Sequence, residues 1–73
     1  MKLYRILGQI WLTHKNQGDY RELGKVDQLL GAENVMQALV KITKQHEKNY
    51  PYSLGMRWGW TACPTVELIK DLG

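Results

Sequence analysis

Cysteine is scarce in this sequence, phenylalanine is absent, and no hydrophobic stretch is long enough to cross a membrane. The single cysteine, Cys63, cannot form an internal disulfide, which is the usual support of a small secreted domain. The apolar start of the chain is short and interrupted by Arg5 and Gln9, and no cleavage site of a signal peptide follows it. We therefore expect a cytoplasmic protein without a membrane partner.

The length of 73 residues fits one small domain, residues 1–73. A chain of this size buries only about 60% of its unfolded surface, so its stability will be modest. With 44% hydrophobic and 23% charged residues and no low-complexity tract, the composition indicates a folded protein. The formal net charge of +3 is compatible with nucleic acid or another acidic partner.

Apolar residues recur at helical spacing along most of the chain, and we predict an all-α fold, a compact bundle of four to five short helices. The predicted helices cover residues 2–15, 19–31, 32–48 and 64–72. Asp19 is a good N-cap for the second of them, and Pro51 limits the third. No alternating pattern predicts a strand.

Residues that could carry catalysis or hold a metal are few. His14, His46 and Cys63 are isolated in sequence, without the spacing of a zinc site. We interpret His46 as a cation near the end of the helix over 32–48, and Cys63 as a small buried residue. No glycine-rich phosphate loop is present, and so short a chain leaves little room for a substrate pocket. We predict no enzyme activity, no cofactor and no metal site.

Two features of the helical prediction concern DNA. The tight junction at Gly31 suggests a helix-turn-helix, but Asp27 and Gln37 stand where that motif packs small or aliphatic residues, so this is a minor alternative. A polar stripe on the helix over 32–48, with steps of four, three and four residues, would track phosphates. The stripe comprises Gln37, Lys41, Lys44 and Lys48. The alternative is a solvated face that happens to be basic.

Residues 49–64, NYPYSLGMRWGWTACP, hold four of the seven large aromatic residues. Tyr52, Met56 and Trp60 fall four apart, on one face of a further short helical segment. Gly55 and Gly59 weaken this segment, so a loop or a single turn is the alternative.

The spacing of Tyr52, Met56 and Trp60 resembles the Y-x-x-x-I-x-x-x-W motif of the DnaD-like primosomal proteins, with Met56 in place of isoleucine. The preceding LGKVDQLLGAENVMQALVKITKQ is similar to the helix pair of the same domain, whose L-x-x-x-x-G-x-x-x-V-x-x-A-L pattern is typical. Here that pattern is carried by Leu29 or Leu30, Gly31, Val35, Ala38 and Leu39. The resemblance covers residues 19–60. It implies a small helical module of replication initiation or helicase loading, often encoded by phages or plasmids, that binds DNA and a replicative helicase or initiator protein.

We therefore predict a non-catalytic DNA-binding and protein-interaction module. The predicted DNA-binding residues are Lys41, Lys44 and Lys48, on phosphates, and Arg57 and Trp58, which with Tyr50 are the candidates for stacking. The alternative is a small phage-type adaptor that binds a host protein through an apolar patch of Leu54, Met56 and Trp58, without binding DNA. A homo-oligomer is a further expectation, because a second copy would complete so small a core.

Overall fold

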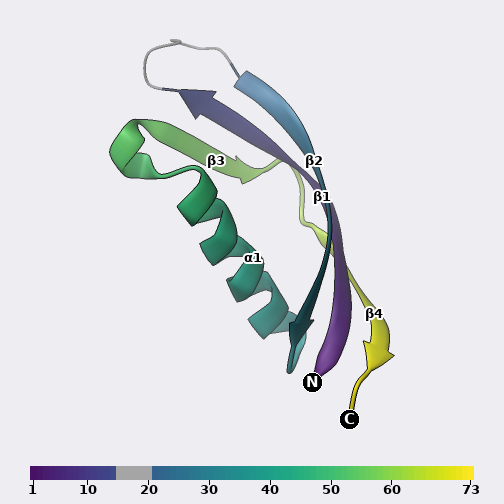
Figure 1. Cartoon of the computed structure of the whole chain (residues 1–73). Helices are drawn as coiled ribbons and strands as arrows, with labels where there is room; N and C mark the ends of the chain where they lie inside the picture. Colours follow the sequence, from purple (N-terminus) through teal and green to yellow (C-terminus); the bar gives the residue numbers. More distant parts are fainter. Residues whose placement is uncertain (15–20) are drawn as a thin grey trace.

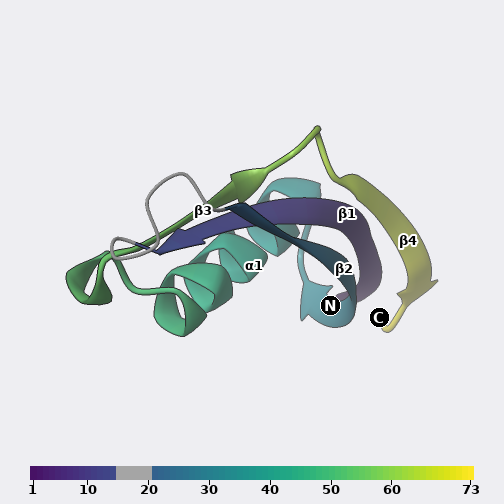
Figure 2. The same cartoon turned by 90° about the horizontal axis from the view of Figure 1, so that it is seen from above.

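The computed structural model describes residues 1–14 and 21–73, and its main feature is a four-stranded antiparallel sheet with one α-helix. The elements follow the order β1 (Lys2–His14), β2 (Arg21–Ala32), α1 (Val35–Asn49), the 3₁₀ turn η2 (Tyr52–Leu54), β3 (Met56–Trp60) and β4 (Thr65–Asp71). The sheet bends around α1, which lies along its concave side (Figure 1). Seen from above, the strands arch over the helix (Figure 2).

β1 is the central strand, and the other three described strands all pair with it. β2 lies beside it from Lys2 to Thr13. On its other side, β3 pairs with residues 10–14 of β1 and β4 pairs with residues 2–7. β3 and β4 therefore share one edge of the sheet, end to end.

The side chains of β1 alternate between the face that α1 covers and the opposite face. Tyr4, Ile6 and Ile10 are buried beneath the helix. Ala38 and Ile42 of α1 are buried with them, and partly buried side chains from β2, β3 and β4 complete this core. Its small size leaves much of the opposite face of the sheet in solvent.

α1 is the one predicted helix that the structure confirms, although it begins at Val35 and not at residue 32. Asn34 caps it, with its side-chain oxygen accepting from the backbone N–H of Gln37 at 2.8 Å. The buried residues Ala38, Ile42 and His46 follow at steps of four, which is the period of one helix face. Within residues 1–14 and 21–73, no helix is long and apolar enough to span a membrane.

The predicted all-α bundle is wrong. The segments predicted as helices over 2–15, 19–31 and 64–72 are strands where the structure describes them, and the predicted cap Asp19 lies outside the described residues. In β1, apolar side chains occupy both faces of the strand. Neighbouring apolar pairs such as Ile6 and Leu7 therefore fit the spacing of a helix, although in the strand the two side chains point to opposite faces. The helix-turn-helix alternative is also wrong, because a strand, β2, precedes α1.

The aromatic stretch is a turn followed by a strand, and not a helical segment. Gly55, with φ of 77°, ends η2 in the left-handed conformation that glycine adopts without strain. Residues four apart share a face in a strand as they do in a helix, so Met56 and Trp60 lie on one side in both. The strand adds Trp58 to that side. The helical fold implied by the DnaD-like spacing is therefore wrong for this segment.

Candidate functional site: an aromatic groove at the edge of β3

A groove of about 460 Å³ lies where the last turn of α1, the turn η2 and β3 meet. Aromatic and apolar side chains make most of its wall: Trp11, Tyr50, Tyr52, Met56 and Trp58. Two charged side chains, Glu47 and Arg57, complete the wall. We call this site the aromatic groove.

The groove follows the edge of β3, and is not confined to one face of the sheet. Met56 and Trp58 point to the face that α1 covers, whereas Arg57 points to the opposite face. Trp11 also lies on that opposite face, with its indole over Gly59. A Cβ placed on Gly59 would be 2.7 Å from the ring. Side chains from both faces thus meet around the edge of the strand.

The backbone of β3 presents hydrogen-bonding groups at the same edge. Among the described residues, β3 pairs with β1 alone. The Thr61 N–H donates to the Gln9 carbonyl at 2.9 Å, and the alternation of an antiparallel pair directs the backbone groups of Gly59 toward β1 as well. By the same alternation, the N–H and C=O groups of Trp58 and Trp60 point away from β1, where no described strand pairs with them.

The two charged residues of the groove differ in their surroundings. The Arg57 guanidinium carbon lies 5.3 Å from the centroid of the Tyr52 ring, and Nη2 donates to the Tyr52 hydroxyl at 3.4 Å. Such a cation–π contact at an exposed site contributes about 0.5–1 kcal/mol. Glu47 is exposed and forms no ion pair with any other described residue. In the part of the chain that the structure describes, the groove therefore has a carboxylate without a cationic partner.

Behind the groove, the imidazole of His46 is buried among aromatic rings. It is 6% exposed, and its ring centroid lies 4.8 Å from that of Trp58, edge to face, and 5.4 Å from that of Trp60. Burial lowers the pKa of His46 below its ordinary value, so the neutral form is favoured. Nδ1 is buried and has no hydrogen-bond partner among the described residues. The predicted cation at the end of this helix is wrong, because the ring points into the molecule.

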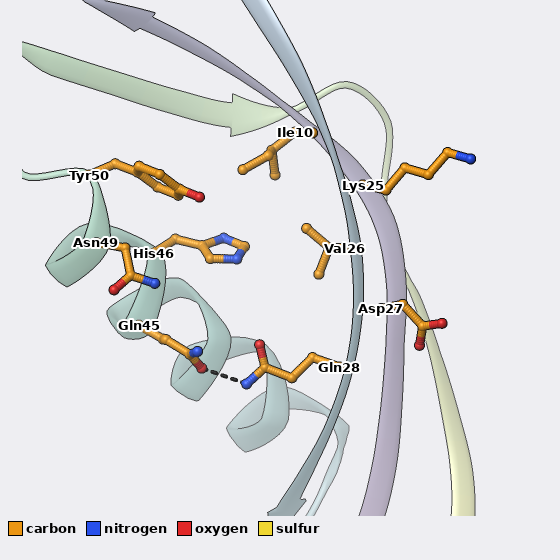
Figure 3. Close-up of a pocket in the computed structure, with 10 residues that line it drawn as sticks. Ile10, Lys25, Val26, Asp27, Gln28, Gln45, His46, Asn49 and Tyr50 are labelled. Atoms are coloured by element: carbon orange, nitrogen blue, oxygen red, sulfur yellow. Dashed lines mark hydrogen bonds between the residues drawn. The ribbon is translucent and has the colours of Figure 1, made fainter.

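A smaller cavity, of about 240 Å³, lies between α1 and β2 (Figure 3). A hydrogen bond of 2.6 Å between the side-chain amides of Gln28 and Gln45 spans from strand to helix at this cavity. Lys25 and Asp27 point away from it, toward the opposite face of the sheet (Figure 3). Tyr50 lines both this cavity and the aromatic groove. In residues 1–14 and 21–73, no three side chains of histidine, cysteine, aspartate or glutamate converge as metal ligands.

The structure divides the predicted DNA-binding residues between two surfaces. Lys41, Lys44 and Lys48 are exposed on α1, and Lys41 reaches the sheet, where its ammonium group donates to the carbonyl of Gly31 in β2 at 2.6 Å. Arg57 and Trp58 line the aromatic groove instead. Although Lys48 is the neighbour of Glu47 in the chain, its side chain projects about 100° further around the helix. The lysine stripe thus lies beside the groove and not in it.

Of the three motif residues, Tyr52 and Met56 line the groove, whereas Trp60 packs inward against His46. Trp11 and Glu47 were missed as groove residues because they come from β1 and α1, far from the aromatic stretch in sequence. Their only sequence signals were an aromatic residue and a charge of a kind common elsewhere in the chain. Cys63 is exposed, so the prediction that it is buried is wrong.

In comparisons with known proteins, no family model matches the chain, and neither a curated protein nor a solved structure matches it. The DnaD-like resemblance therefore stays a prediction from two short sequence patterns. What the chain binds has to be inferred from the chemistry of the groove.

Proposed function

We propose that this chain is a non-catalytic protein-interaction module that binds an extended segment of a partner protein along the free edge of β3. One observation carries the proposal: backbone groups that pair with no other described strand and an aromatic groove lie on the same edge of the sheet. When a peptide adds a strand to a sheet, its main-chain hydrogen bonds supply affinity, and pockets for alternate side chains supply specificity. β3 offers both.

The edge formed by β4 is less suited to strand addition. Its register with β1 shifts, which leaves Ile69 as an extra residue opposite β1, and Glu67 and Lys70 add charges. Bulges and charged side chains are the devices by which proteins discourage pairing at an exposed edge. β3 pairs with β1 without a shift of register, and Arg57 is its one charged residue. We therefore assign the docking edge to β3.

The experiment starts with phage-displayed random peptides selected on the intact chain, followed by synthesis of the tightest binder. Hydrogen exchange of single amides, measured by NMR, then reports where the peptide lies. We expect the amides of Trp58 and Trp60 to exchange rapidly in the free chain and slowly in the complex. The amide of Gly59 faces β1 already and should change little.

Two substitutions provide the comparison. Trp58→Ala removes a wall of the groove and should weaken peptide binding. Leu54→Ala is the matched control, because Leu54 is 75% exposed in η2 beside the groove but does not line it. Selected peptides that bind both variants equally and leave the Trp58 and Trp60 amides unprotected would place binding elsewhere and overturn the proposal.

Binding of single-stranded DNA is a second candidate, favoured by cations that lack a carboxylate partner. Lys44, Lys48 and Arg57 form no ion pair with a carboxylate of the described residues, and aromatic rings such as Trp58 offer stacking surfaces for bases. We expect quenching of tryptophan fluorescence by short oligothymidine, weakened by added salt and by Lys44→Glu with Lys48→Glu. The absence of quenching at low salt would remove this candidate. A replicative helicase or initiator as the partner, and the cytoplasm as the compartment, stay predictions from the sequence.

A further inference from the structure

We infer that the side chain which the aromatic groove takes from the docked segment is basic, arginine or lysine. This inference rests on the proposed function, strand addition at β3, and adds the chemistry of the partner. Three features of the groove favour a cation: a carboxylate without a cationic partner among the described residues, the faces of aromatic rings, and the carboxyl end of α1.

Glu47 is the first feature. Its carboxylate lines a mainly apolar groove, and no cation of residues 1–14 and 21–73 pairs with it. A docked segment that covered Glu47 with an apolar side chain would remove water from an unpaired charge, which is unfavourable. A glutamate or aspartate there would add like-charge repulsion. A basic side chain pairs with the carboxylate as it displaces the water, so it alone leaves the charge compensated.

The aromatic rings are the second feature. A guanidinium or ammonium group is attracted to the face of an aromatic ring, most strongly to that of tryptophan. Arg57 already shows this chemistry at one end of the groove, where its guanidinium lies over Tyr52. Arg57 is held at Tyr52, and Trp58 and Tyr50 are other rings of the groove that a cation from the partner can meet.

The carboxyl end of α1 is the third feature. The Tyr50 N–H donates to the His46 carbonyl at 2.8 Å, which satisfies that oxygen. The next carbonyl, that of Glu47, would receive its helical hydrogen bond from residue 51, but Pro51 has no N–H. The negative end of the helix dipole, which favours cations, therefore lies in the last turn of α1, to which both Glu47 and Lys48 belong.

The test uses the tightest selected peptide and a series that differs from it at the groove position alone. Arginine or lysine there is compared with norleucine, which keeps the aliphatic chain and removes the charge, and with glutamate. We expect norleucine to bind about tenfold more weakly than arginine, and glutamate more weakly still. In Glu47→Gln, the preference for arginine over norleucine should shrink without vanishing, because the aromatic rings and the carboxyl end of α1 remain. Glu67→Gln, which removes an exposed carboxylate of β4, should keep the preference for arginine.

The outcomes separate this inference from the proposed function. If norleucine and arginine peptides bind equally, or if selected peptides protect the Trp58 and Trp60 amides without containing a basic residue, the inference is overturned and strand addition stands. If no peptide protects these amides, both are overturned. A preference for arginine that is undiminished in Glu47→Gln would overturn the role of Glu47.

Discussion

The indole of Trp60 lies over Gly8, so closely that a Cβ built on Gly8 would be 2.8 Å from a ring atom. Gly8 belongs to the central strand, and Trp60 ends the neighbouring strand β3. A large ring thus covers a position of β1 that has no side chain of its own. The same indole contacts His46 of α1, with 5.4 Å between ring centroids. Trp60 therefore joins β1, β3 and the helix.

Substitution of Gly8 by alanine tests this contact. In Gly8→Ala the new methyl group overlaps the Trp60 ring, and overpacking of this kind lowers the free energy of unfolding by about 1–3 kcal/mol. Gly24→Ala is the matched control on β2, because its Cβ would lie at an ordinary 3.7 Å from Ile10. That variant should be neutral or slightly stabilising. Denaturant unfolding of both variants gives the comparison, and equal stabilities would mean that the Trp60 ring yields without cost.

Substitution of Gly59 tests how Trp11 builds the groove. A Cβ on Gly59 would lie 2.7 Å from the Trp11 indole, so Gly59→Ala should displace that ring from the edge of β3. We expect weaker binding of the selected peptide, together with a change in the emission of the tryptophans. Gly24→Ala again serves as the control, since Gly24 lies outside the aromatic groove. Unchanged peptide affinity in Gly59→Ala would show that Trp11 is dispensable for binding.

The burial of His46 makes stability depend on pH. Because burial lowers the pKa of His46 below the ordinary 6.5, the folded chain binds this proton less readily than the unfolded chain does. The free energy of unfolding should therefore be constant above pH 6.5 and fall as the pH drops below it. Lys25 and Asp27, the two charged residues that border the neighbouring cavity, point away from the face of the sheet on which the His46 imidazole lies (Figure 3).

The measurement is denaturant unfolding at a series of pH values on both sides of 6.5. His46→Leu should remove the pH dependence of the free energy of unfolding, because the buried imidazole that resists protonation is absent. His14→Gln removes the other histidine and should leave this pH dependence unchanged. A wild-type profile that stays flat below pH 6.5 would contradict the burial of the imidazole.

The N-cap of α1 gives a further prediction. The Asn34 side chain accepts from the Gln37 N–H at 2.8 Å, and loss of such a cap lowers stability by about 1 kcal/mol. Asn34→Ala should show this loss in thermal or denaturant unfolding, whereas Asn34→Asp keeps an acceptor and should retain wild-type stability. If both variants lose the same amount, the amide of Asn34 contributes through other contacts.

The helix was predictable from sequence and the strands were not, for reasons that lie in their side chains. α1 buries one face, so its Ala38, Ile42 and His46 follow a single period. β1 buries Tyr4, Ile6 and Ile10 on one face, but its other face also holds apolar side chains, and together they fill a helical pattern. The sheet is determined by pairing between strands that are distant in sequence. The spacing of apolar residues within one segment gives no information on that pairing.

The site was predictable in part. Seven residues were singled out from one short stretch, and five of them line the groove: Tyr50, Tyr52, Met56, Arg57 and Trp58. Leu54 and Trp60 do not line it. Their arrangement was not predictable, because a five-residue segment can place Met56 and Trp60 on one side as a helix or as a strand. The contribution of Trp11 depends on the pairing of β1 with β3, which brings it over Gly59. No local pattern in the sequence indicates that pairing.

The central position of β1 has a consequence for how the molecule assembles and opens. β2, β3 and β4 each pair with β1 and, in the part of the chain that is described, not with one another. The β1–β2 hairpin joins segments close in sequence, whereas β3 and β4 must close much longer loops, so the hairpin should form first during folding. In the native state, a local opening of β3 would leave β1 and β2 paired, because β2 and β3 lie on opposite sides of β1. A segment bound along β3 would oppose this opening, so occupancy of the groove would lengthen the lifetime of the complete sheet.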